Sequence, residues 1–199
     1  MRAKLVYEQI ENILRPKSEK EILFHLENLS PNNLLMKSSE IGFLPGVKLA
    51  LEKGADVHVE DDCVLRWTSQ EGYKDIVELL LKNGADVHAD GDDAIRWASR
   101  NGHKDVVELL LKNGANVNAW NSAALRWASA NGHKDVVELL LKNGAHVHAD
   151  DDYALHRASM YGYKDVVELL LKNGADAHNQ EALYWATKKG LLGTFKKYM

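Results

Sequence analysis

The sequence predicts an all-α solenoid, a stack of short helices that repeats along one axis. The segment Lys104–Ala115 (KDVVELLLKNGA) recurs without change at Lys134–Ala145 and at Lys164–Ala175. Its apolar residues follow the spacing of one helix face. Turn glycines stand every 30 residues, at Gly54, Gly84, Gly114, Gly144 and Gly174. Self-similarity at a period of roughly 20–50 residues is typical of stacked-repeat architectures.

The 199 residues are expected to form one elongated domain, because each unit of a solenoid buries its apolar face against its neighbour. We expect a helical N-terminal cap at 1–30 and the solenoid at 31–199. The repeat predicts units at about 31–60, 61–90, 91–120, 121–150 and 151–178, followed by a C-terminal cap at 179–199. The first and last units depart from the repeat, as capping units do.

The N-terminal cap does not follow the repeat. A helical stripe from Leu5 to Leu14 stops before Pro16, and Ser18 with Glu21 forms the capping box of a second helix. Our main interpretation is a lid over the apolar end of the first unit. The alternative is a separate docking segment that recruits another protein.

Each complete unit is expected to contain two helices, as the unit 121–150 illustrates. Ala123–Ala130 forms the first helix and Lys134–Asn143 the second, and each ends at a glycine turn. The second helix has a wide apolar face and an exposed Glu–Lys pair four residues apart, in the favourable order. Residues 145–153 are too few and too polar for anything but a turn that projects from the stack.

This pattern of helix, glycine turn, helix and Gly-Ala-Asp-Val-His resembles the ankyrin repeat, over about residues 31–199. The resemblance is clearest in the second helix and its turns, at Gly102-His103, Val106-Val107 and Leu109–Ala115. The family's usual unit has about 33 residues and a Thr-Pro-Leu-His opening. Here the unit has 30 residues and the openings read DAIR, AALR and YALH, so the projecting hairpin is expected to be about three residues shorter.

The short unit and the phrase ALRWAS look like ankyrin proteins of giant DNA viruses. The family resemblance implies a non-catalytic scaffold that binds a protein partner in a concave groove. An alternative is an adaptor, or a viral or bacterial effector, that recruits or blocks a host protein through the N-terminal helices. We expect a monomer without a cofactor.

Composition narrows the class of partner. The net charge of −4 leaves no basic footprint for nucleic acid, and no run of 18 apolar residues would cross a membrane. The single cysteine, Cys63, indicates a reducing compartment. The expected location is the cytoplasm, or the host cytoplasm if the protein is viral, with neither nucleic acid nor membrane as a partner.

Two apparent metal sites fail on geometry. A histidine column at His58, His88, His148 and His178 is interrupted by Asn118. Helices of neighbouring repeats lie about 8–10 Å apart, whereas two ligands of one zinc ion must lie within roughly 4 Å. We therefore expect these histidines to bond the loop backbone between repeats. A calcium loop starting at Asp86 fails because Trp97 stands where the bidentate glutamate is needed.

No catalytic constellation emerges from the sequence. His103 and His133 each stand two residues before an aspartate, but these pairs recur as part of the repeat. Cys63 has no special setting, and neither a phosphate-binding loop nor a nucleophile elbow is present. We expect no enzyme activity.

Two further columns have a structural and a functional interpretation. Arg66, Arg96 and Arg126 follow core residues and stand near Asp61/Asp62, Asp92/Asp93 or Asn121. They form either an internal Arg–Asp ladder, which we favour, or a basic stripe for an acidic partner. The tryptophans of the second column are expected to pack between repeats as buried indoles, at Trp67, Trp97, Trp127 and Trp185.

Variation between near-identical units indicates where a partner binds. The units differ mainly in the projecting turn and at the end of the first helix. In ankyrin-like proteins these positions line the partner groove, and exposed aromatic and Met side chains are enriched at interfaces. The predicted partner-binding residues are Trp120, Tyr153, Met160, Tyr161, Arg100, Asn101, Ala130 and Asn131. The acidic turns Glu60–Asp62, Asp90–Asp93 and Asp150–Asp152 would steer a basic partner.

Overall fold

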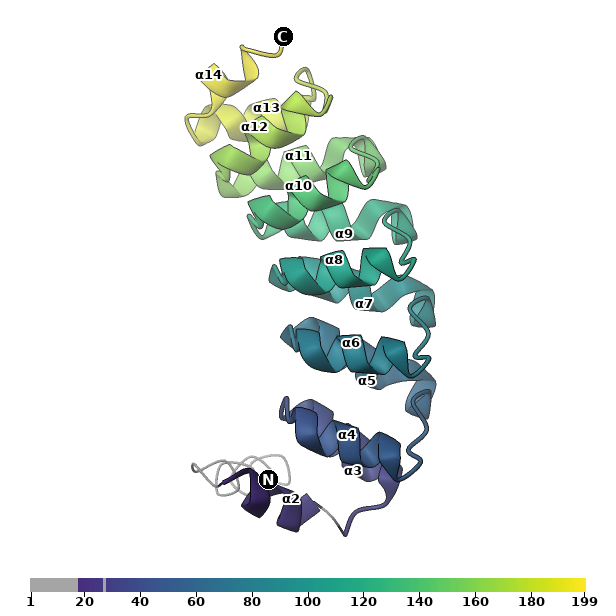
Figure 1. The fold of residues 1–199 in the computed structure, drawn as a ribbon. Helices are drawn as coiled ribbons and strands as arrows, with labels where there is room; N and C mark the ends of the chain where they lie inside the picture. Colours follow the sequence, from purple (N-terminus) through teal and green to yellow (C-terminus); the bar gives the residue numbers. More distant parts are fainter. Residues whose placement is uncertain (1–17, 27) are drawn as a thin grey trace, which may run out of the picture.

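The computed structural model describes residues 18–26 and 28–199, and every regular element in these ranges is an α-helix. The helices stack in layers from α2 to α14 (Figure 1). The predicted all-α solenoid is therefore confirmed. The predicted helical stripe from Leu5 to Leu14 lies outside the described residues.

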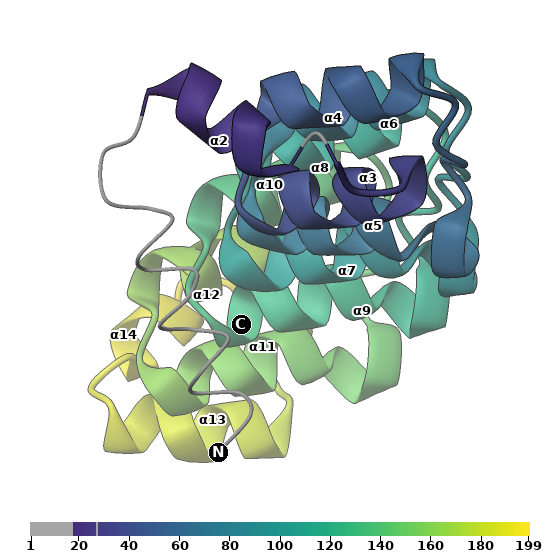
Figure 2. The same ribbon diagram turned by 90° about the horizontal axis from the view of Figure 1, so that it is seen from below.

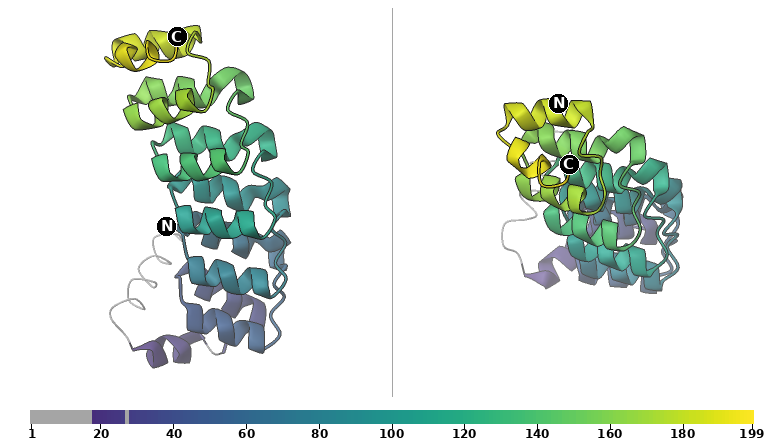
Figure 3. Two further views of the ribbon diagram at one scale, coloured as in Figure 1. Left: turned by 45° about the horizontal axis from the view of Figure 1, so that its top comes forward. Right: turned by 90° about the horizontal axis from the view of Figure 1, so that it is seen from above.

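The layers consist of two rows of helices, which Figure 2 shows from below and Figure 3 shows obliquely and from above. The first helices are α3 (Pro31–Glu40), α5 (Val59–Glu71), α7 (Ala89–Asn101), α9 (Ala119–Ala130), α11 (Ala149–Tyr161) and α13 (Gln180–Lys188). The second helices are α4 (Leu44–Glu52), α6 (Lys74–Lys82), α8 (Lys104–Lys112), α10 (Lys134–Lys142), α12 (Lys164–Lys172) and α14 (Leu192–Phe195). Neighbouring first helices contact each other more extensively than neighbouring second helices do.

The core is a column of aliphatic side chains that runs through the layers. In α9, Leu125, Ala128 and Ser129 are fully buried. Because Ala128 and Ser129 are small, the first helices can approach one another closely. Fully buried leucines in the second helices continue the column at Leu80, Leu110, Leu140 and Leu170.

Short elements cover both ends of the described stack. At one end, α2 (Glu19–Leu26) packs against α3 and α4, with Leu26 buried. The Glu21 carboxylate accepts the backbone N–H of Ser18 at 2.7 Å, which is the glutamate arm of the predicted capping box. At the other end, α14 packs against α12 and α13 and buries Phe195.

A left-handed turn precedes four of the first helices. In α5, α7, α9 and α11, three consecutive residues near the start have φ between 50° and 64°. The right-handed helix begins only after them, so that of α9 starts at Ala123, as predicted. Asp, Asn and Gly adopt this backbone more readily than other residues, and they occupy most of these positions. A compact turn of this kind accounts for the short 30-residue unit.

Successive turns are joined by buried side chains that accept a backbone N–H. Asp62 Oδ1 accepts the amide of Asp86 at 2.9 Å, and Asp92 Oδ1 accepts that of Asn116 at 2.7 Å. Buried Ser122 and Asp152 bond the amides of His146 and Asp176 in the same way, and the partly buried Asn32 bonds that of Asp56. Because each bond spans 24 residues along the chain, the series ties every layer to the next.

The histidine column supports this series of bonds, but not as predicted. The ring Nδ1 of His58 donates to Asp62 within the same turn at 2.9 Å, so our expectation of a bond to the loop backbone is wrong there. His88 and His148 bond Asp92 and Asp152 in the same way. Where Asn118 interrupts the column, Ser122 replaces the aspartate, and its hydroxyl donates to the Asn118 side chain at 2.6 Å. The two residues of the pair have changed together.

A different column joins the far ends of the first helices. The ring Nε2 of His133 donates to the carbonyl oxygen of Arg100 at 2.9 Å, and His103 bonds Gln70 in the same way at 2.8 Å. The ring of His133 also packs on Gly102, where an added Cβ would lie 2.6 Å from it. Tyr73 and Tyr163 pack on Gly42 and Gly132 in the same way, so an aromatic ring at this position packs each of these layers against the preceding one.

We expect Leu110→Ala to lower the free energy of unfolding by about 2–5 kcal/mol, because it leaves a cavity in a fully buried column. Urea denaturation followed by circular dichroism measures the change. Leu111→Ala on the same helix is the control, since Leu111 is only partly buried and should lose less. Equal losses would contradict the assigned core.

Gly102→Ala is expected to destabilise the fold more than Gly114→Ala. Both positions have positive φ, 81° and 96°, so both variants lose about 1–2 kcal/mol to the left-handed backbone. Only the new methyl group at position 102 meets the ring of His133, which adds about 1–3 kcal/mol of overpacking. Thermal unfolding of the two variants side by side measures the difference, which should vanish if this ring contact is unimportant.

Candidate partner-binding surface

One face of the molecule is formed by the exposed side chains of the first helices and the left-handed turns before them. We call it the first-helix face. On α9, Leu125, Ala128 and Ser129 occupy the buried side, so Trp127 turns outward and is 43% exposed. Trp67 at the equivalent position of α5 is 40% exposed. The prediction that these tryptophans pack as buried indoles is therefore wrong for both.

Arg100 lies between two of these tryptophans. Its guanidinium carbon is 4.9 Å from the ring centre of Trp97 in the same helix and 4.9 Å from that of Trp127 in the next layer. Both distances are within the roughly 6 Å range of cation–π attraction. The stack joins α7 to α9 on the exposed side, and sequence reasoning missed it because it read the tryptophans as core.

A second cluster surrounds Arg157 on α11. Its guanidinium carbon lies 5.6 Å from the ring centre of Tyr153 and 5.0 Å from that of Tyr161. Its Nη2 donates to the hydroxyl of Tyr161 at 2.9 Å, and its Nη1 approaches the sulfur of Met160 at 4.0 Å. Three predicted site residues therefore gather around one arginine that breaks the tryptophan column.

The other arginines of this face form ion pairs with aspartates. Arg66 Nη1 is 2.6 Å from an Asp90 carboxylate oxygen, and Arg126 Nη1 is 2.8 Å from one of Asp150. Arg96 pairs with Asp93 in the same helix. The Arg–Asp ladder interpretation is confirmed, although Arg66 and Arg126 reach the turn of the next layer rather than their own.

Trp120 is 60% exposed in the left-handed turn of α9. Its indole N–H donates to the carbonyl oxygen of Gly91 at 2.9 Å, and the guanidinium of Arg96 lies 5.0 Å from its ring. An added Cβ at Gly91 would lie 2.7 Å from the indole nitrogen, so the glycine makes room for the tryptophan. The side chain thus points back to the preceding layer.

The predicted aromatic and Met site residues lie in two groups. Trp120 lies in a turn before a first helix, whereas Tyr161 lies at the opposite end of α11. The eight residue-to-residue steps from Tyr153 to Tyr161 span about 12 Å of helix. Trp120 contacts Gly91 and Arg96 of the preceding layer, whereas Tyr153, Met160 and Tyr161 gather around Arg157.

Three predicted site residues are either buried or already hydrogen-bonded to the backbone. Ala130 is only 7% exposed, so its prediction as an exposed contact is wrong: a methyl group is too short to reach past its neighbours. Asn101 and Asn131 are exposed, and each side-chain amide donates to a backbone carbonyl, that of Gln70 at 2.8 Å and that of Trp127 at 2.9 Å.

The repeat is matched by the family model for ankyrin repeats (three copies), over residues 65–151 and 125–197. The chain belongs to the ankyrin-repeat family. Ankyrin repeats generally mediate protein–protein interaction, and the family is typically non-enzymatic. No curated protein matches the sequence.

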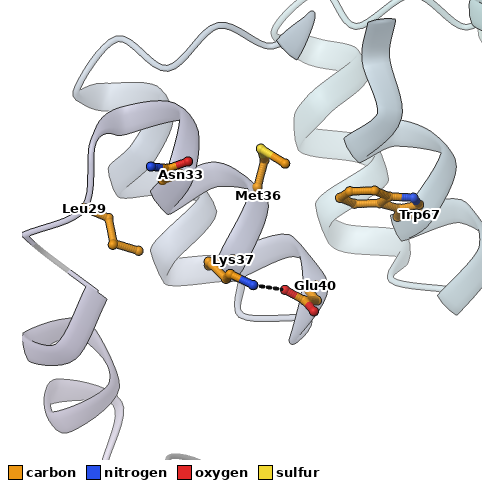
Figure 4. Close-up of a pocket in the computed structure, with 6 residues that line it drawn as sticks. All are labelled: Leu29, Asn33, Met36, Lys37, Glu40 and Trp67. Atoms are coloured by element: carbon orange, nitrogen blue, oxygen red, sulfur yellow. Dashed lines mark hydrogen bonds and ion pairs between the residues drawn. The ribbon is translucent and has the colours of Figure 1, made fainter. Parts of the chain in front are cut away.

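At the N-terminal end of this ankyrin array, the first-helix face contains an apolar hollow of about 500 Å³. It is lined by Leu29, Asn33, Met36, Lys37, Glu40 and Trp67. Figure 4 shows Met36 and Trp67 facing one another across it, with the ion pair of Lys37 and Glu40 along one side. The hollow was not predicted from the sequence. One signal was present: the first unit has Lys37 where the next three units have tryptophan, so Trp67 has no tryptophan beside it in the preceding layer.

Cys63 is buried and forms no disulfide. Burial raises the pKa of the Cys63 thiol, which disfavours the reactive thiolate. In residues 18–26 and 28–199, no cluster of His, Cys, Asp or Glu side chains could hold a metal ion. Among the same residues, no helix is long and apolar enough to cross a membrane.

The hydrogen bond to Asp62 raises the pKa of His58, because the carboxylate favours the protonated ring. We expect Asp62→Asn to lower this pKa toward the ordinary value of about 6.5. An NMR titration of the His58 ring protons measures the shift. The asparagine keeps an oxygen for the Asp86 amide, so the layer contact should survive. An unchanged pKa would show that Asp62 is not the cause.

Proposed function

We propose that this ankyrin-repeat protein is a non-catalytic scaffold that binds a protein partner through the first-helix face. The observation that carries the proposal is the row of exposed and partly exposed aromatic and arginine side chains across three adjacent layers. It runs from Trp97 and Trp127 to Tyr161, and includes Arg100 and Arg157. Aromatic residues and arginine are enriched among the residues that contribute most to binding energy.

The second helices offer a useful contrast. Their exposed sides carry Glu–Lys pairs four residues apart, such as Glu108 with Lys112 at 2.7 Å and Glu138 with Lys142 at 2.7 Å. Exposed pairs of this kind are typical of a solvated surface and contribute only about 0–1 kcal/mol. The two rows therefore differ in surface chemistry although both repeat every layer, which favours the first-helix face for binding.

The proposed contact residues are those predicted from the sequence, without Ala130 and with two tryptophans added. They are Trp97, Arg100, Asn101, Trp120, Trp127, Asn131, Tyr153, Met160 and Tyr161. Their side chains occupy the centre of the face and its two edges, so a partner that contacts all of them covers the width of the face as well as several layers.

The left-handed turns form an acidic edge beside this surface. Asp90 and Asp150 are paired with arginines, and the exposed carboxylates of Asp61 and Asp151 add further negative charge. Charged groups at the rim of an interface raise the association rate more than the affinity. We therefore propose that the part of the partner nearest the turns is basic.

A second candidate function rests on the N-terminal end. The apolar hollow beside Trp67 and the 65% exposed Phe24 of α2 favour an adaptor, or an effector, that recruits or blocks a host protein there. A monomeric state, a cytoplasmic location and a giant-virus source stay predictions. The last two depend on the single cysteine and on the phrase ALRWAS.

We expect the double variant Trp120→Ala and Tyr161→Ala to lose its partner while staying folded. Affinity capture from cytosolic extract with quantitative mass spectrometry, followed by calorimetry with the captured protein, measures the loss. Its melting temperature should fall by less than about 4 °C, since both side chains are largely exposed.

Two controls separate the alternatives. Tyr198→Ala removes an exposed aromatic of the C-terminal end and should retain the partner. Phe24→Ala tests the N-terminal candidate, because loss of the partner in this variant alone would move the binding site to α2. Unfolding of the double variant would assign Trp120 and Tyr161 a structural role, and identical capture by all variants would refute binding at this face.

A further inference from the structure

The arginines of the first-helix face fall into two groups. Arg66, Arg96 and Arg126 each have an aspartate partner, as described above. Within residues 18–26 and 28–199, Arg100 and Arg157 have no carboxylate oxygen within 4.0 Å. The same fold therefore provides neutralised arginines and uncompensated ones on a single face.

The surroundings of Arg157 indicate an anionic partner. Its side chain is partly buried, and its buried Nε has no hydrogen-bond partner among the described residues. Its other polar contacts are the neutral phenol of Tyr161 and the thioether of Met160. A cation that is partly removed from water is unfavourable unless it is paired. The repeat also places tryptophan at this position, so Arg157 is a departure from the pattern.

The side chain of Arg100 is also held in an orientation suited to an anionic ligand. The indoles of Trp97 and Trp127 lie against the guanidinium and limit its orientation, and the carbonyl of its own backbone is bonded by His133. Stacking on the faces of the guanidinium leaves the N–H groups at its edge for a ligand. A guanidinium held in this way presents a fork that matches a carboxylate in two parallel hydrogen bonds.

We propose that Arg100 and Arg157 bind two carboxylates of an acidic segment of the partner. The inference rests on the proposed function, because it assigns the chemistry of the ligand at the same face. The head of Arg100 lies between α7 and α9, and that of Arg157 lies on α11. At about 8–10 Å per layer the two heads are roughly 12–15 Å apart. In an extended segment this corresponds to side chains about four or five residues apart.

The charges of the other side chains give the segment a direction. Arg126 stands between the two heads, but Asp150 neutralises it, so it adds little attraction for an acid. The carboxylates of the left-handed turns line the opposite end of the first helices and would repel acidic residues. The partner therefore places acidic residues over the helices and basic residues at the turns.

The test uses the full chain with a hexaglutamate peptide as the probe. Binding is followed by the fluorescence of the exposed tryptophans, with hexaglutamine and hexalysine as control peptides. Hexaglutamate should bind, and its affinity should fall as salt is added. Arg100→Gln and Arg157→Gln should each weaken its binding by about three- to tenfold, as expected for loss of one charge-assisted contact.

A matched control and a second variant keep the result interpretable. Lys112→Gln removes a cation from the second helices, where Lys112 pairs with Glu108, and should leave hexaglutamate affinity unchanged. If Arg157→Gln lowers the melting temperature, Arg157→Lys tests the same point. Lysine keeps the positive charge but lacks the planar guanidinium. The affinity of Arg157→Lys for hexaglutamate should therefore lie between that of the wild type and that of Arg100→Gln.

Three outcomes would overturn the proposal. The first is no hexaglutamate binding by the folded chain, and the second is unchanged affinity in the Arg100→Gln, Arg157→Gln double variant. The third is equal binding of hexathymidylate, which would show a contact with any polyanion instead of an acidic peptide. The scaffold function is decided separately by the capture experiment, which uses no acidic probe. A negative peptide result with retained capture therefore rejects only the acidic ligand.

Discussion

The stack depends on one hydrogen bond that recurs from layer to layer. A buried side chain at the end of each left-handed turn accepts the backbone amide of the following loop, as Asp62 does for Asp86. This bond satisfies an amide at the layer boundary and fixes how far one layer is displaced from the next. Because the bond uses a turn of only three left-handed residues, the chain can repeat every 30 residues without a longer hairpin.

The fixed displacement between layers also creates the exposed face. Side chains at equivalent positions of the first helices come into register, so a column in the sequence becomes a row on the surface. Arg100 can then reach Trp127, and Arg66 can reach Asp90, across the boundary between layers. A substitution in one unit consequently affects contacts with the neighbouring unit, as the packing of Trp120 on Gly91 shows.

Much of the candidate site could be anticipated from variation between the units. Tyr153, Met160 and Tyr161 were singled out as departures from a near-perfect repeat, and they gather around Arg157. The stack of Arg100 between Trp97 and Trp127 was not anticipated, because a recurring tryptophan has the same pattern in a core as on a face. Whether it is buried depends on the helix register within the layer, which periodicity defines only to within a residue or so.

By itself, the sequence determined the architecture of this protein. The repeated phrase, the glycines and the apolar spacing define an all-α solenoid and its layers, because each of these is a local property repeated along the chain. Only the tertiary structure decided which side chains meet across layers. It showed that His58 bonds Asp62, that Ala130 is covered, and that Trp120 and Tyr161 lie at opposite edges. Such contacts depend on the displacement of one layer against the next, a quantity that no single repeat contains.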